Sequence, residues 1–200
     1  MSPRILLKSH RTELVERNSR FIGIGYISQS LNEFKLQKEA LEDEFADSNH
    51  VTFAYRILDN NSMHTRFYDA MEPSGTAGKP ILMHLEGNDL INITLFVVRY
   101  FGGVKLGAGG LVKAYGNTAR QLIQEAEWGP YVIYQDLWLT LPYSEQNRLE
   151  YLARKHSVEI LERHFSELVH CRISIAENEV SSFREGLPKS WEFLKDFKGC

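Results

Sequence analysis

Two glycine-rich segments carry the side chains of this sequence that are most able to bind an anion. EPSGTAGKP occupies residues 72–80, and RYFGGVKLGAGGLVKAYG occupies residues 99–116. A glycine loop that leads into a helix presents backbone N–H groups that can hold a phosphate. The accompanying hydroxyl and basic candidates are Ser74, Thr76, Lys79, Arg99, Lys105 and Lys113.

The second segment has the pattern of a strand, a loop and a helix. Apolar residues at 95–98 lead into it, and apolar residues then recur at helical spacing from Leu111 to Ile123. Gly107, Gly109 and Gly110 would let backbone N–H groups approach a phosphate. Tight turns and close helix packing explain the same glycines equally well, so both interpretations stay open.

Neither segment matches a common nucleotide-binding motif. In the first, Gly78 and Lys79 are followed by Pro80 rather than by Ser or Thr, which excludes a Walker A loop. In the second, the glycines lack the GxGxxG spacing of a dinucleotide-binding turn. An anion site in these loops would therefore be of another kind.

Acid–base or metal chemistry is a separate candidate. Asp69 and Glu72 form a carboxylate pair three residues apart, and His50 is a further titratable group. Such a set can act as acid, base or metal ligand, although scattered residues of these types are more often ordinary surface or core residues. Ser74 does not lie in a GxSxG motif, and the two cysteines form no metal-binding pattern. We expect no metal and no resident cofactor.

Tyr100 and Phe101 follow Arg99 and offer another way to hold nucleic acid. Proteins that bind single strands stack the bases on aromatic side chains flanked by positive charge. Two aromatic residues at the end of a strand are more often part of a core, and both interpretations stay open.

Composition and charge describe a globular protein with one basic region. The chain has 200 residues, 43% hydrophobic content and a net charge of −3, which argues against coating nucleic acid by bulk electrostatics. Residues 75–120, in contrast, carry a net charge of +3. No apolar stretch approaches the roughly 20 residues needed to cross a bilayer, and no secretory signal is visible. We therefore expect a cytoplasmic protein without a membrane partner.

The apolar pattern predicts an α+β protein with two domains. In the first part we expect strands at 12–15, 21–28, 49–57, 65–68 and 90–100, and helices at 34–45, at 80–87 and from the second loop to about 126. Trp128, Gly129 and Pro130 interrupt the helical pattern and mark a boundary. Strands at 132–141, 158–165, 168–176 and 191–197 and helices at 144–156 and 180–187 then give the βαββαβ order of a ferredoxin-like domain. The expected domains are 1–128 and 132–200.

The combination of motifs resembles the YigZ/IMPACT family. The residues that carry the resemblance are EPSGTAGKPIL at 72–82 and VVRYFGGVKLGAGGLVKAY at 97–115, preceded by NSRFIG at 18–23 and by His50 with AYRI at 54–57. It is strong over about residues 1–127, and the tail is similar to the second domain of bacterial members. The resemblance implies a first domain like domain 2 of ribosomal protein S5 and a second like the C-terminal domain of elongation factor G.

The sequence departs from the family pattern in the first loop. The family usually reads DDGEPSGTAG, whereas here Ala70 and Met71 stand between Asp69 and Glu72. One carboxylate and one glycine are therefore replaced, while the basic positions of the loops are retained. This balance favours binding over catalysis.

The resemblance implies a role connected with translation. Our leading hypothesis is a regulatory protein, not an enzyme, that binds RNA or the ribosome through a groove lined by the two loops. An alternative is an enzyme that acts on a small phosphorylated substrate, with Glu72, Asp69 or His50 as acid, base or metal ligand. A third hypothesis is a module that a translation factor recognises. The sequence leaves the RNA, the partner and the oligomeric state open.

Overall fold

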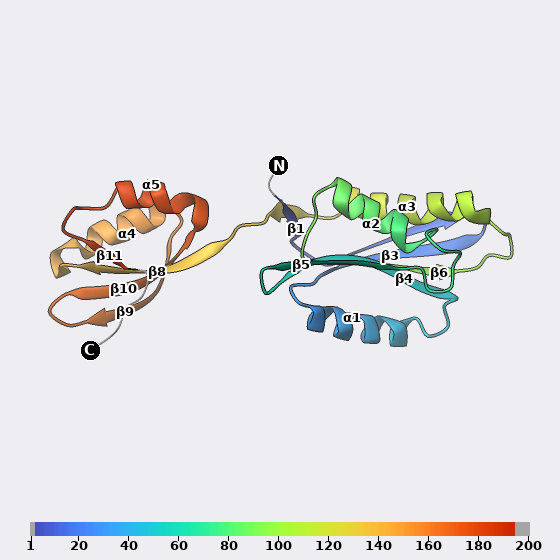
Figure 1. The fold of residues 1–200 in the computed structure, drawn as a ribbon, viewed down its shortest axis with the longest axis horizontal. Helices are drawn as coiled ribbons and strands as arrows, with labels where there is room; N and C mark the ends of the chain where they lie inside the picture. The colour runs from blue at the N-terminus through green and yellow to red at the C-terminus, as the bar shows by residue number, and fades with distance from the viewer. Residues whose placement is uncertain (1–2, 195–200) are drawn as a thin grey trace. The chain divides into compact units, whose positions relative to one another are not determined.

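The computed structural model describes residues 3–194 and forms two compact units, Met1–Tyr131 and Val132–Cys200. Helices and strands occur in both units (Figure 1), which confirms the α+β class. The elements of the first unit are β1 (Arg4–Leu6), β2 (His10–Glu16), β3 (Ser19–Ile27), α1 (Leu31–Glu44), β4 (His50–Asp59), β5 (Ser62–Tyr68), α2 (Gly78–Gly87), β6 (Ile93–Tyr100), α3 (Gly107–Glu125) and β7 (Trp128–Pro130). None of the helices within residues 3–194 is long and apolar enough to span a membrane.

A five-stranded antiparallel sheet, in the order β2-β3-β6-β4-β5, forms the centre of the first unit. Strand β6 lies in the middle, and every residue of it except Tyr100 is buried. A short and nearly continuous apolar run is typical of a strand that is covered on both faces. Helices α2 and α3 cover one face of the sheet and α1 covers the other (Figure 1).

The two faces can be followed along β6, because successive side chains of a strand alternate. Leu95 and Val97 belong to the apolar cluster under α2 and α3. Phe96 and Val98 belong to the cluster that packs against α1. Arg99 follows Val97 by two positions and therefore points to the side of α2 and α3. The strand thus delivers a guanidinium group to the end of the sheet where the two glycine loops lie.

Two-residue turns close two hairpins of this sheet. Arg17 and Asn18 connect β2 to β3, and Asn60 and Asn61 connect β4 to β5, all four with positive φ. Turns of this kind match the right-handed twist of the strands that they connect. Both lie within the connections predicted from the sequence.

Strands β1 and β7 form a separate two-stranded ribbon within the first unit. Arg4 is paired with Pro130, and Leu6 with Trp128, in an antiparallel register. Trp128, Gly129 and Pro130, which were predicted to break the helical pattern and mark a domain boundary, form the last strand of the first unit. The sequence did not reveal this pairing, because strands of three residues are too short to show a periodicity.

The second unit is a four-stranded antiparallel sheet in the order β11-β8-β10-β9, with α4 and α5 on one face (Figure 1). Its elements are β8 (Tyr134–Leu141), η1 (Tyr143–Glu145), α4 (Gln146–Lys155), β9 (Glu159–Phe165), β10 (Val169–Ala176), η2 (Glu177–Glu179), α5 (Val180–Glu185) and β11 (Glu192–Leu194). This order confirms the ferredoxin-like pattern. The predicted continuation of the last strand over 195–197 lies outside the described residues.

Candidate functional site

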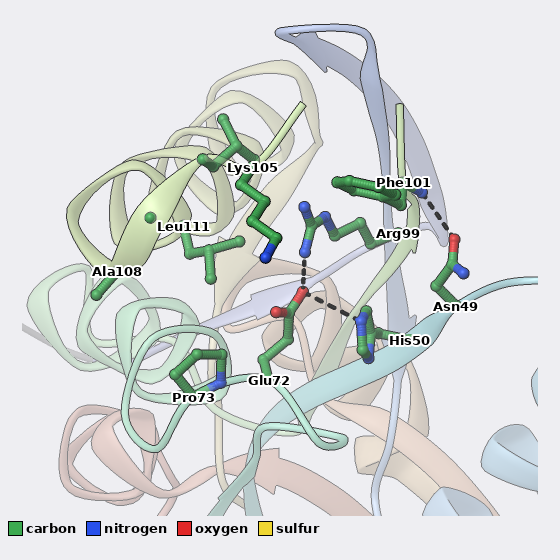
Figure 2. Close-up of a pocket in the computed structure, with 11 residues that line it drawn as sticks. Asn49, His50, Glu72, Pro73, Arg99, Phe101, Lys105, Ala108 and Leu111 are labelled. Atoms are coloured by element: carbon green, nitrogen blue, oxygen red, sulfur yellow. Dashed lines mark hydrogen bonds and ion pairs between the residues drawn. The ribbon is translucent and has the colours of Figure 1, made fainter. Parts of the chain in front are cut away.

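A cavity of about 420 Å³ lies in the first unit, where the ends of β4 and β6 meet the two glycine loops and the start of α3 (Figure 2). Its volume is within the range of about 300–1,000 Å³ that is usual for small-molecule sites. The lining residues are Asn49, His50, Glu72, Pro73, Arg99, Phe101, Lys105, Leu106, Gly107, Ala108 and Leu111.

A buried carboxylate, Glu72, holds the base of this cavity together. Its Oε1 accepts a hydrogen bond from Nη1 of Arg99 at 2.6 Å and from the hydroxyl of Tyr115 at 2.8 Å. The Glu72 and Arg99 side chains are 4% and 7% exposed. Removing one partner of so buried a pair leaves the other charge uncompensated, at a cost of about 3–5 kcal/mol. The pair therefore ties the first glycine loop to the central strand.

Tyr115 serves this network only as a hydrogen-bond donor. Burial, together with the charge of the neighbouring Glu72 carboxylate, raises the pKa of the Tyr115 hydroxyl above its usual value of 10.0. The hydroxyl therefore keeps its proton at neutral and mildly alkaline pH. Its position on α3 connects that helix to the first loop, because Glu72 belongs to the loop.

Arg99 has hydrogen-bonding capacity that the folded chain does not use. Its guanidinium carbon lies 5.5 Å from the ring centre of Phe21 and 5.6 Å from that of Phe101. Such distances allow cation–π attraction. The buried Nε of Arg99 has no hydrogen-bond partner among residues 3–194. Leaving a buried donor unpaired is unfavourable, so this atom requires an explanation.

His50 reaches the same carboxylate from β4. Its Nδ1 lies 2.8 Å from the carbonyl oxygen of Ala70, and its Nε2 lies 3.7 Å from Oε1 of Glu72. A carbonyl oxygen can only accept, so Nδ1 carries a hydrogen atom. In the neutral ring, Nε2 is then an acceptor, and it faces Oε1 of Glu72 (Figure 2).

The second glycine loop ends at a helix N-terminus without a side-chain cap. Leu106 is the N-cap residue of α3, and it makes no capping hydrogen bond. The first N–H groups of a helix have no partner within the helix, and the helix dipole makes this end positive. Lys105, which makes no hydrogen bond or ion pair within residues 3–194, extends into the cavity beside Arg99 (Figure 2). This rim can donate to an anion.

The first glycine loop has its N–H groups already occupied. Asp69 accepts hydrogen bonds from the backbone N–H of Gly75 at 2.9 Å, Ala77 at 3.1 Å and Gly78 at 2.8 Å. A carboxylate at the N-terminus of a helix is favourable for the same electrostatic reason as a bound anion. At α2 the chain therefore supplies its own anion.

The structure brings together six of the residues singled out in the sequence and leaves the others outside the cavity lining. The six that line it are His50, Glu72, Arg99, Phe101, Lys105 and Gly107. The remaining candidates do not: Asp69, Ser74, Thr76, Lys79, Gly109, Gly110 and Lys113. Among these, Ser74, Lys79 and Lys113 are exposed, and the buried hydroxyl of Thr76 donates to the carbonyl oxygen of Pro73 at 2.6 Å. Within residues 3–194 there is no cluster of three His, Cys, Asp or Glu side chains suited to a metal ion.

Sequence reasoning missed Tyr115 and Asn49. Tyr115 was interpreted only as an apolar position of a helix, and its spacing does not reveal that its hydroxyl meets Glu72, 43 residues away. Asn49 accepts a hydrogen bond from the N–H of Phe101 at 2.7 Å and so orients the start of the second loop. Tyr100 and Phe101 do not form one aromatic platform: Phe101 lines the cavity, whereas the hydroxyl of Tyr100 donates to Asp47.

Comparison with known proteins places the chain among bacterial relatives. The model of the Impact N-terminal domain matches residues 17–123, and that of a domain of unknown function, DUF1949, matches residues 139–188. An IMPACT family member from Haemophilus influenzae is 33% identical over 86% of this chain and 84% of its own length. IMPACT family member YigZ from Escherichia coli is 31% identical over 84% of this chain and 82% of its own length.

One solved structure has a similar fold over nearly the whole chain. A crystal structure of a hypothetical protein aligns with 99% of this chain and 98% of its own chain, at 28% identity and a TM-score of 0.67. The two-domain translational regulator Yih1 aligns with 59% of this chain and 47% of its own chain, at 23% identity and a TM-score of 0.40, which is too low to support an inference about function. Because the Impact N-terminal model matches residues 17–123 and the bacterial relatives align with most of the chain, the chain belongs to the IMPACT family.

Proposed function

We propose that this protein is a translation-associated factor that binds single-stranded RNA, with a phosphate held at the N-terminus of α3. The observation that carries the proposal is the convergence of two unused sets of donors on one cavity. The uncapped start of α3 and the side chains of Lys105 and Arg99 all line this cavity. Arg99 itself has a buried Nε that has no hydrogen-bond partner among residues 3–194.

The glycines at the start of α3 support the same proposal. A Cβ atom built at Gly109 meets no atom within 4 Å, and its φ does not require glycine. Gly102 is different, because a Cβ there lies only 2.0 Å from the backbone of Asn18. Packing therefore explains Gly102 but not Gly109. The open space at Gly109 allows a phosphate to approach the helix backbone.

Phe101 supplies the other element of a single-strand site. Its side chain lines the cavity and the residue is 46% exposed, beside the guanidinium of Arg99. A half-exposed ring next to a cation is suited to stack on a base, and stacking tolerates any base. This arrangement favours single strands, whose bases are accessible.

The test is a titration of labelled single-stranded RNA by fluorescence anisotropy at several salt concentrations. We expect the logarithm of the binding constant to fall with the logarithm of salt concentration, by about 0.7 for each phosphate contacted. Lys105→Glu should weaken binding by at least about tenfold, because it replaces attraction by repulsion at the phosphate. The matched control is Lys35→Glu, since Lys35 is exposed on α1, on the opposite face of the sheet. Affinity that does not change with salt, or an equal loss in both variants, contradicts the proposal.

A second candidate function is an enzyme that acts on a small phosphorylated molecule. The cavity favours it, because a pocket of this size joins His50 and Glu72 to the phosphate-binding rim. Against it, Oε1 of Glu72 already has two donors, and Asp69 is held by backbone N–H groups of the first loop. Saturable binding of a mononucleotide in calorimetry, followed by its conversion to product, would establish the enzyme. Saturable binding without conversion would leave it a binding site.

A further inference from the structure

The cavity has donors at its rim and acceptors at its base. At the rim are Lys105 and the start of α3. At the base are Glu72 and Nε2 of His50, whose ring is fixed by the hydrogen bond of Nδ1 to Ala70. A ligand that fits this polarity carries negative charge at one end and a hydrogen-bond donor at the other.

The acceptors at the base lie on two sides of the Glu72 carboxylate (Figure 2). Nε2 of His50 lies 3.7 Å from Oε1 of Glu72, and Oε1 is occupied by Arg99 and Tyr115. The other oxygen of Glu72 takes part in no interaction drawn in Figure 2 and points away from His50. A hydroxyl group beside His50 finds an acceptor in Nε2 without breaking the contacts of Glu72. A phosphate placed here would instead be repelled by the carboxylate.

We propose, building on the RNA-binding role above, that His50 selects ribose over deoxyribose by accepting, at Nε2, the hydrogen bond that the 2′-hydroxyl of a nucleotide in this cavity donates. The phosphate of that nucleotide lies at the start of α3 and its base lies against Phe101. The 2′-hydroxyl is the group by which a protein distinguishes RNA from DNA at a given position. The volume of about 420 Å³ is suited to a single nucleotide rather than to a longer segment.

The orientation of His50 supports this selection. Because Nδ1 donates to a main-chain carbonyl, the neutral ring has only Nε2 left, and Nε2 can accept but not donate. The side chain is 21% exposed, so water reaches it in the free protein and a ligand hydroxyl can replace that water. A deoxynucleotide offers no hydroxyl at this position and leaves Nε2 of His50 unpaired, which lowers its affinity.

The experiment compares oligouridylate with oligodeoxyuridylate of about 12 nucleotides, which differ only in the 2′-hydroxyl. We expect the intact protein to bind the RNA at least about tenfold more tightly than the DNA. His50→Phe keeps a ring but removes the acceptor, so its RNA affinity should fall to the level of its DNA affinity. Lys105→Ala is the comparison variant: it should weaken RNA and DNA binding by the same factor and keep their ratio.

The outcomes separate this inference from the function on which it rests. Equal affinity of the intact protein for RNA and DNA, both falling with salt, overturns the selection and leaves the RNA-binding proposal standing. Absence of binding to either oligomer overturns both. A preference for RNA that survives in His50→Phe, with the variant folded by circular dichroism, overturns the assignment to this residue.

Discussion

The two glycine-rich loops both lead into helices, but their backbone N–H groups meet different partners. At α2, the carboxylate of Asp69 accepts from Gly75, Ala77 and Gly78. At α3, no side chain caps the helix, and Lys105 stands unpaired among the described residues. The positive N-terminus of α2 is therefore paired with a carboxylate of the chain itself, whereas the N-terminus of α3 has no side-chain partner. A glycine-rich sequence alone does not reveal which of the two it encodes.

The loops also differ in how they form their tight turns. Around the second loop, the residues with positive φ are glycines, Gly103 and Gly107. The first loop also has a glycine with positive φ, Gly75, but in the turn before it two other residues, Ala70 and Met71, have φ of 48° and 65°. An L-residue in this region is strained by roughly 1–2 kcal/mol. The contacts of Asp69 and Glu72 on either side of this turn hold it in place.

The largest expected effect is loss of the internal anion. Asp69→Ala removes the acceptor from three N–H groups, those of Gly75, Ala77 and Gly78, and the last two residues are buried. We expect the free energy of unfolding of the first unit to fall by about 3 kcal/mol. Urea unfolding, with hydrogen exchange of β6 to report on this unit, measures the change.

The matched control for this prediction is Asp43→Ala. Asp43 is exposed on α1, and its removal should change stability by less than about 0.5 kcal/mol. A similar effect of both substitutions would show that Asp69 does not hold the first loop. The N-terminus of α2, with Asp69, and the uncapped N-terminus of α3 would then not differ in the way described above.

The sequence revealed the elements of the fold more fully than the geometry of the site. The two hairpin turns and the buried strand β6 have local signals, namely Asn-containing polar connections and an apolar run. The network of Glu72, Arg99 and Tyr115 joins residues 27 and 43 positions apart, and no local pattern encodes it. Asp69 and Glu72 look equivalent in sequence, yet one faces backbone N–H groups and the other faces the cavity. Only the turn at Ala70 and Met71 separates them.

The next prediction concerns Tyr115, which connects α3 to the first loop. The pKa of its hydroxyl is raised in the folded protein, so above about pH 10 the unfolded chain releases this proton before the folded chain does. The contribution of this hydroxyl to the free energy of unfolding is therefore fully present below pH 10. Above pH 10 it declines by about 1.4 kcal/mol per pH unit. Tyr115→Phe loses about 1 kcal/mol at neutral pH and should lack this part of the decline.

Urea unfolding between pH 9 and about pH 11 tests this prediction. The difference in stability between the original protein and Tyr115→Phe should shrink as the pH rises through this interval. Tyr151→Phe is the control, because Tyr151 is 60% exposed and should follow the original protein at each pH. Parallel curves for the original protein and Tyr115→Phe would mean that the hydroxyl is not buried against Glu72.

A smaller effect is expected from relieving the strained turn. Met71 has a φ of 65° and is 88% exposed, so Met71→Gly removes strain without removing packing. We expect a gain of about 1 kcal/mol in the free energy of unfolding, measured in urea. Gly107→Ala introduces the opposite change at a φ of 70° and should lose about the same amount. If Met71→Gly and Gly107→Ala both raised or both lowered the free energy of unfolding, backbone strain would not be the cause of both changes.

The smallest change in stability is expected from a substitution at Gly109, and it gives the sharpest test of phosphate binding at the uncapped N-terminus of α3. The position is helical and has room for a Cβ, so Gly109→Ala should stabilise α3 by about 0.5 kcal/mol. The same methyl group occupies the space through which a phosphate reaches the first N–H groups, so RNA affinity should fall severalfold. The two effects have opposite signs, and no general loss of structure produces that combination. If the variant gains stability and keeps its RNA affinity in anisotropy titrations, the start of α3 is not where the phosphate binds, and the open end is only an uncapped helix.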